Sequence, residues 1–250
     1  MYFVLLCYRK EADALRRLTT FLLRTFCMLL TALVLSSSLT AYAEYDAEHP
    51  ELLTEDDITA VSCILIEQST GEVIFEKDAD KLMYPASTTK IMTVLLGLLA
   101  TDDLNELVTV SYNGSKAGVR AQLDPDSSTL GLKEGEQLTM RDLLYGTILR
   151  SGNDAAIAIA EHVSGTEAEF VQLMNQTAQM FGMTNTNFMN PHGLHHDYHY
   201  TTARDLATLS YEAMKNDTFK EIVRSDRHQM AATNEQKERM ISTGHRIMLK

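Results

Sequence analysis

Cysteine is scarce in this chain of 250 residues, which contains only three. Cys7 and Cys27 lie in the N-terminal leader described below, so Cys63 alone remains in the rest of the chain. One cysteine cannot form an intramolecular disulfide, which excludes a disulfide-stabilised scaffold. Cys63 lies in the alternating apolar segment 61–66, and we expect it to be a buried thiol in a strand rather than a reactive one.

Basic residues are outnumbered: 22 lysines and arginines stand against 34 aspartates and glutamates, and the formal net charge is −12. Proteins that bind nucleic acid neutralise its phosphates with lysine and arginine, so no nucleic-acid partner is expected. The same acidic balance opposes adhesion to an anionic membrane by electrostatics. The chain also lacks internal repeats and low-complexity tracts, and its length suits one domain with a sizeable core.

The apolar stretch 25–35 is too short for a full membrane span, which needs about 20 apolar residues. This stretch is preceded by Arg16, Arg17 and Arg24, and Ala41-Tyr42-Ala43 follows it as a small-residue cleavage pattern. We therefore expect residues 1–43 to be a signal peptide for export. The protein would then act outside the cytoplasm, in the cell wall or periplasm or on the outer face of the cytoplasmic membrane. The alternative is a retained signal anchor.

The remaining chain is expected to comprise an acidic arm over residues 44–57 and one domain over 58–250. Alternation of apolar residues predicts a hairpin of two strands, and helical periodicity with capping residues predicts several helices. The expected strands are 61–66 and 72–77, with a short extended piece at 108–110 and extended segments near 238–249; residues 113–135 are expected to form long surface loops. The expected helices are one entered at Pro85 and those over 139–149, 154–163, 167–180 and 202–214. This order indicates an α+β fold, with an antiparallel sheet flanked by helices and a helical subregion.

Ser87 and Lys90 stand three residues apart at the start of an apolar run, so on a helix their side chains lie one turn apart on one face. Pro85 suits the entry to such a helix, and Ser87 then falls in the first turn, where the positive dipole end favours an alkoxide or oxyanion. The same field and desolvation disfavour a charged Lys90, which can then take the hydroxyl proton of Ser87. The competing interpretation is an ordinary helix start with a solvated lysine.

A second element, Ser151-Gly152-Asn153, lies between two predicted helices, where a short connection can project inward. Ser151 offers a hydroxyl that can relay a proton to a leaving amine, and Asn153 offers an amide that can hold both Lys90 and a substrate peptide group. An ordinary interhelix turn explains the same three residues, because serine, glycine and asparagine are common in turns.

Histidines cluster further along the chain at positions that permit zinc binding by spacing alone: His192, His195, His196 and His199. Pro191 and Gly193 indicate a loop rather than the helix that would align them on one face. We therefore expect no metal site, and nothing in the sequence points to another cofactor.

In combination, these motifs resemble the penicillin-binding, active-site serine family, and most closely its low-molecular-mass D-alanyl-D-alanine carboxypeptidases. The resemblance covers roughly residues 58–250. The segments that carry it, in order and spacing, are 65–73, 85–93, 138–144, 151–156 and 190–203.

This resemblance implies a β-lactamase/transpeptidase-like fold. It implies that Ser87 is the acylated nucleophile, Lys90 its general base, Ser151 the proton relay and Asn153 the positioning amide, with the backbone N–H of Ser87 as half of an oxyanion hole. The implied substrates are peptidoglycan stem peptides, from which the terminal D-alanine is removed, and β-lactam antibiotics are the implied inhibitors.

One signature of the family, a Lys-Thr-Gly on an edge strand, is absent, and Ser242-Thr243-Gly244 is the nearest string. We therefore expect residues 58–250 to be an incomplete catalytic domain that lacks its C-terminal strands. Membrane association would come only through the leader or through a missing C-terminal segment. Two alternatives remain open: a non-catalytic penicillin-binding or wall-binding fragment, and a serine β-lactamase of the same fold.

Overall fold

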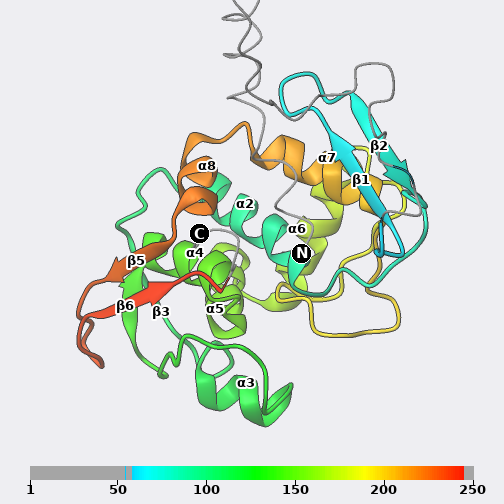
Figure 1. The fold of residues 1–250 in the computed structure, drawn as a ribbon. Helices are drawn as coiled ribbons and strands as arrows, with labels where there is room; N and C mark the ends of the chain where they lie inside the picture. The colour runs from blue at the N-terminus through cyan, green and yellow to red at the C-terminus, as the bar shows by residue number, and fades with distance from the viewer. Residues whose placement is uncertain (1–53, 55–57, 245–250) are drawn as a thin grey trace, which may run out of the picture. The chain divides into compact units, whose positions relative to one another are not determined.

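The computed structural model describes residue 54 and residues 58–244 (Figure 1). The chain divides into two units, residues 1–77 and 78–250, each considered by itself below. The expected signal peptide, nearly all of the acidic arm and the last six residues lie outside the described part. No helix in that part is both long enough and apolar enough to cross a membrane.

The described part of the first unit is an antiparallel hairpin of β1 (Cys63–Ile66) and β2 (Val73–Lys77), which confirms the predicted hairpin. Cys63 lies opposite Lys77, and the register shifts between Leu65 and Ile66. The Glu67 carboxylate closes the turn by accepting hydrogen bonds from the Ser69 hydroxyl and from the backbone N–H groups of Ser69 and Thr70, and these bonds lower its pKa to about 2. Cys63 is a buried free thiol, as expected.

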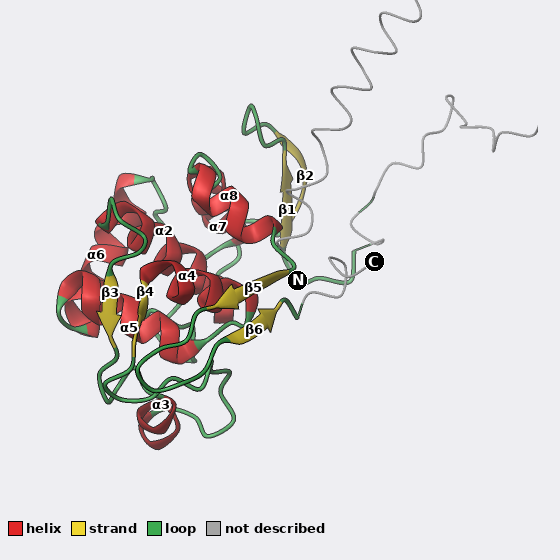
Figure 2. Ribbon diagram, turned by 90° about the vertical axis from the view of Figure 1, so that its left-hand side faces the viewer, coloured by secondary structure: helices red, strands yellow, loops and turns green. Residues whose placement is uncertain are grey.

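The second unit is mainly helical (Figure 2). Its helices are α2 (Lys90–Ala100), α3 (Lys116–Gln122), α4 (Met140–Leu149), α5 (Asn153–Ser164), α6 (Glu167–Met180), α7 (Ala203–Ala213) and α8 (Asp217–Arg224), and a 3₁₀ turn, η3 (Ala86–Thr89), precedes α2. Helix α5 lies at the centre and packs against α2, α4 and α6. Its small side chains, Ala155, Ala156, Ala158 and Ala160, are fully or almost fully buried, so neighbouring helices can approach closely.

Three of the predicted helices, α4, α6 and α7, have capped N-termini at or within one residue of the expected positions. The Thr139 side chain accepts a hydrogen bond from the N–H of Asp142, as the sequence spacing indicated, and Thr166 and Thr202 cap α6 and α7 in the same way. Each such cap satisfies a donor that the first helical turn leaves unpaired. The sequence therefore predicted where these three helices begin.

The strands of the second unit form two further antiparallel pairs, β3 (Leu107–Thr109) with β4 (Gln137–Thr139) and β5 (Arg227–Met230) with β6 (Arg239–Ser242). In the described part of the chain, strands therefore occur as separate two-stranded sheets rather than as one larger sheet. The expectation of loops throughout 113–135 was wrong, because α3 forms there with Ser115 as its cap. In both views α3 lies at one end of the helical unit (Figure 1, Figure 2).

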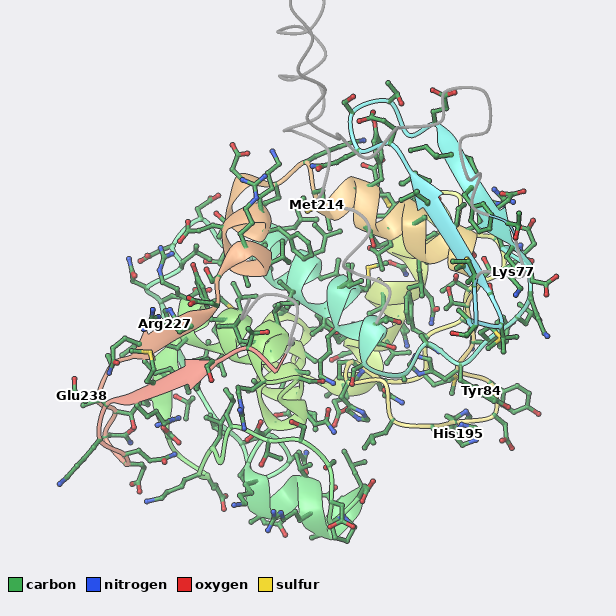
Figure 3. The ribbon with its side chains drawn as sticks, viewed as in Figure 1. Lys77, Tyr84, His195, Met214, Arg227 and Glu238 are labelled. Atoms are coloured by element: carbon green, nitrogen blue, oxygen red, sulfur yellow. The ribbon has the colours of Figure 1, made fainter. Side chains whose placement is uncertain are left out.

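The connection between β5 and β6 is anchored by Glu136, which is completely buried. Its carboxylate accepts hydrogen bonds from the Arg239 guanidinium at 3.2 Å, from Gln236 at 2.7 Å and from Thr233 at 3.0 Å. Arg227 and Glu238 mark the start of β5 and the residue before β6 (Figure 3). A buried carboxylate is tolerable only with such partners, so this network fixes the hairpin to the segment that precedes β4.

Candidate active site

Ser87 lies in the 3₁₀ turn η3, and Lys90 begins α2 directly after it. Ser87 therefore lies in the first turn of the helical segment entered at Pro85, as expected, and this turn is a 3₁₀ helix that leads into α2. The one-turn relation between the two side chains is present, because a 3₁₀ helix has three residues per turn and aligns residues three apart. Lys90 Nζ donates to Ser87 Oγ at 3.3 Å.

The ammonium of Lys90 is removed from water, since the residue is only 2% exposed. Burial lowers the pKa of Lys90 to about 7, and the negative charge of Asp154 opposes this shift. Lys90 Nζ also donates to the carbonyl oxygen of His192 at 2.5 Å. The amine is thus held in place and is free of its proton in a substantial fraction of molecules near neutral pH, as a general base requires.

Ser151 brings a second hydroxyl to the nucleophile, and its Oγ donates to Ser87 Oγ at 2.9 Å. Asn153, the first residue of α5, is 4% exposed and lies two positions after Ser151 in the chain. From the sequence, the Asn153 amide was expected to hold Lys90. Lys90 Nζ donates hydrogen bonds to Ser87 Oγ and to the His192 carbonyl oxygen, and the second of these partners was missed by sequence reasoning.

The backbone adopts an unfavourable conformation at two positions of the site, Ala86 and Ser151. Among the described residues, the non-glycine positions with positive φ are Asp78, Ala86 at 48° and Ser151 at 54°. Ala86 directly precedes Ser87, and Ser151 is the residue whose hydroxyl reaches it. A left-handed conformation costs a residue with a side chain about 1–2 kcal/mol, and such strain persists only where surrounding contacts impose it. Both sides of the site are therefore held in place by contacts outside the local sequence.

Gly193 forms one of these contacts. Its φ is +86°, and a Cβ added there would lie 1.9 Å from the Ala86 carbonyl oxygen and 3.0 Å from the Ser87 nitrogen. Thr93 Oγ1 donates to the Pro191 carbonyl at 2.6 Å, which ties the same loop to α2. Only a residue without a side chain permits this approach of the loop to the backbone of the nucleophile.

The four clustered histidines have different partners, and His196 Nδ1 accepts from the Tyr198 N–H at 3.1 Å. His192 is buried, its Nδ1 accepts from the Leu194 N–H, and burial lowers its pKa to about 3. His199 lies within 2.9 Å of Thr89 Oγ1, and burial lowers its pKa to about 4. His195 contacts the exposed ring of Tyr84 edge-on, with ring centroids 4.5 Å apart (Figure 3). Across the described residues, no group of three or more His, Cys, Asp or Glu side chains is arranged to hold a metal ion.

A serine hydroxyl in contact with a buried lysine of lowered pKa and with a second serine defines the active-site serine class in which lysine serves as the base. The sequence model of the D-alanyl-D-alanine carboxypeptidases, peptidase S11, matches residues 47–249. The chain belongs to this family, as the sequence motifs predicted.

Curated relatives include the D-alanyl-D-alanine carboxypeptidase DacF of Bacillus subtilis, which is 35% identical over 195 residues, covering 76% of this chain and 47% of the relative. DacA of Haemophilus influenzae is 33% identical over 215 residues, covering 79% of this chain and 54% of the relative. The chain thus spans about half the length of these relatives.

Solved structures are also similar. Penicillin binding protein 5 of Haemophilus influenzae has a TM-score of 0.69 and 30% identity, with 79% of this chain and 56% of that chain covered. A variant of the Streptomyces K15 DD-transpeptidase has a TM-score of 0.70 and 30% identity, with 76% of each chain covered. The α+β, transpeptidase-like fold predicted from sequence is therefore confirmed.

Proposed function

We propose that this chain is the acyl-transfer part of a serine-type D-alanyl-D-alanine carboxypeptidase, a hydrolase that trims peptidoglycan stem peptides. The observation that carries the proposal is the convergence of Lys90 Nζ and Ser151 Oγ on Ser87 Oγ, at 3.3 Å and 2.9 Å. Membership of the carboxypeptidase family supports the substrate class.

In the proposed reaction, neutral Lys90 takes the hydroxyl proton while Ser87 Oγ bonds to the carbonyl carbon between the two terminal D-alanines. The backbone N–H of Ser87 stabilises the oxyanion, and Asn153 positions the peptide group. The C–N bond then breaks, and Ser151 relays to the departing amine of D-alanine the proton that Lys90 took from Ser87. Water hydrolyses the ester and restores Ser87. A β-lactam would acylate the same serine, because its ring amide presents the same electrophile.

We also propose that the reaction takes place outside the cytoplasm, where peptidoglycan lies. The support for this location is the leader sequence, with arginines, an apolar stretch and a small-residue pattern that ends at Ala43.

The direct test is to incubate the purified chain with a labelled penicillin and to measure intact mass. The expected result is one adduct that Ser87→Ala abolishes and Ser225→Ala leaves unchanged, since the Ser225 hydroxyl donates to the Glu221 carbonyl at the end of α8. Release of D-alanine from an N-acylated Lys-D-Ala-D-Ala peptide should show the same dependence. Persistence of the adduct in Ser87→Ala would contradict the assignment.

Two other outcomes of this experiment separate the alternatives. A Ser87-dependent adduct without release of D-alanine would identify a penicillin-binding fragment that is not a carboxypeptidase. Rapid turnover of the penicillin itself would identify a β-lactamase.

The rate of acylation is expected to depend on pH through Lys90, whose pKa burial lowers to about 7. Only the neutral amine accepts the proton of Ser87, so the rate should rise about tenfold per pH unit below this value and level off above it. The measurement is the second-order rate constant for penicillin acylation between about pH 5 and about pH 9. A rate that falls with rising pH across this range would exclude Lys90 as the base.

A further inference from the structure

One residue, Ser128, makes hydrogen bonds to the chain on both sides of Ser151. Ser128 Oγ donates to the Arg150 carbonyl at 2.6 Å, and the Ser128 carbonyl accepts from the Asn153 N–H at 2.8 Å. The two bonds therefore attach to the residue immediately before Ser151 and to the residue two positions after it. We name this pair of hydrogen bonds the Ser128 clasp.

The loop that carries the clasp, residues 128–132, is itself anchored by Asp154, which is completely buried. The Asp154 carboxylate accepts hydrogen bonds from the backbone N–H groups of Leu130, Gly131 and Leu132 at 2.9, 2.9 and 3.1 Å. Charge-assisted bonds of this kind in a buried site are strong, so Asp154 ties the backbone of residues 130–132 firmly to α5.

Packing adds to this attachment. A Cβ added at Gly152 would lie 3.1 Å from the Leu130 Cγ, and one added at Gly146 would lie 2.2 Å from a Leu130 methyl carbon. The Leu130 side chain thus lies against the backbone on the α4 side and on the α5 side of the turn. The loop contacts this backbone closely enough to set its path.

Ser151 needs such a support because its φ is 54°, in the left-handed region that residues with a side chain rarely adopt. The conformation is also the one in which its hydroxyl reaches Ser87 Oγ at 2.9 Å. A relaxed turn would redirect this hydroxyl, and displacement by about 1 Å is enough to slow a reaction by on the order of 10²-fold.

We infer that Ser128 is a positioning residue, whose clasp holds Ser151 in the left-handed conformation that directs its hydroxyl to Ser87. The role of that hydroxyl in proton transfer rests on the proposed function, whereas the clasp itself is a property of the fold. Ser128 acts through Ser151 and does not contact the reacting atoms.

The first test compares penicillin acylation of Ser128→Ala, Ser128→Thr and Ser127→Ala. Ser127 is a matched control, because its hydroxyl donates to the Asp124 carbonyl within its own loop. Ser128→Ala should lower the acylation rate constant about 10-fold to 100-fold without weakening the initial noncovalent binding. Ser128→Thr, which keeps the hydroxyl, and Ser127→Ala should retain rates close to that of the wild type.

A double-mutant cycle separates positioning from a general loss of structure. If Ser128 acts through Ser151, Ser128→Ala should cause no further loss in a chain that already carries Ser151→Ala. A full additional loss in the Ser151→Ala background would overturn the inference.

The second test does not depend on activity and uses amide hydrogen exchange. Ser128→Ala should accelerate exchange at the Asn153 amide, whereas Ser127→Ala should not, and exchange in α2 should stay unchanged in both. Unchanged exchange at Asn153 in Ser128→Ala would refute the clasp even if the wild type is not acylated. Failure of the wild type to be acylated, together with faster exchange in Ser128→Ala, would contradict the proposed function and support the clasp.

Discussion

Replacement of Lys90 by methionine is expected to lower the rate of penicillin acylation by on the order of 10²–10⁴-fold, the range typical of a lost general base. Methionine fills a similar volume but cannot accept the proton of Ser87. The Ser87 hydroxyl would keep its contact with Ser151, which offers no base. Rates measured by intact mass over time provide the comparison.

The same replacement should stabilise the folded protein, because burial lowers the pKa of Lys90 from 10.5 to about 7. A lysine whose pKa is lower in the folded state than in the unfolded state costs stability at low pH, and the cost diminishes as pH rises toward the unfolded value. The cost below about pH 7 is on the order of 4–5 kcal/mol. Loss of the hydrogen bond to the His192 carbonyl offsets about 1–3 kcal/mol of this gain.

Urea denaturation of Lys90→Met and wild type at about pH 6 and about pH 10 measures this effect. The gain in midpoint should be large at the lower pH and small at the higher one. Lys116→Met, a replacement at the exposed first residue of α3, should change neither the acylation rate nor the pH dependence of stability. A pH-independent effect of Lys90→Met would contradict the buried, weakly basic lysine on which the mechanism depends.

Substitution of Gly193 by alanine is expected to remove most of the acylation activity, by about 10²-fold or more. The new Cβ would lie 1.9 Å from the Ala86 carbonyl oxygen, so backbone and not a flexible side chain must move. Ala86 precedes the nucleophile and is itself in the left-handed region, at φ 48°, so displacement passes directly to Ser87. The relation of Ser87 to Lys90 and Ser151 would change with it.

Gly182→Ala is the matched control for this substitution. Gly182 has a comparable φ of +75°, but a Cβ there would meet nothing within 4 Å. Both variants should lose about 1–2 kcal/mol of stability to left-handed strain, and Gly182→Ala should nevertheless be acylated at the wild-type rate. Equal acylation losses in the two variants would show that the contact with Ala86 has no separate effect.

Local sequence was sufficient for the parts of the fold that local interactions specify. The helical pattern of 167–180, which ends before Gly182, predicted α6, and the two strands separated by residues 67–71 predicted the β1–β2 hairpin. The elements that sequence reasoning missed are short and carry weak local signals. Strand β5, with the sequence Arg-His-Gln-Met, has no apolar alternation and is held by pairing with β6 and by its contacts with the helical unit.

For the candidate site, the sequence by itself determined which groups are chemically able to react and that Ser87 and Lys90 lie one turn apart, because a separation of three residues is a local relation. The tertiary structure decided the rest: the burial that lowers the pKa of Lys90, the His192 carbonyl that holds its amine, and the positive φ of Ser151. Each of these depends on contacts between segments far apart in the chain, such as the 102 positions between Lys90 and His192. The periodicity and capping of a single segment carry no information about which distant loop will lie against it.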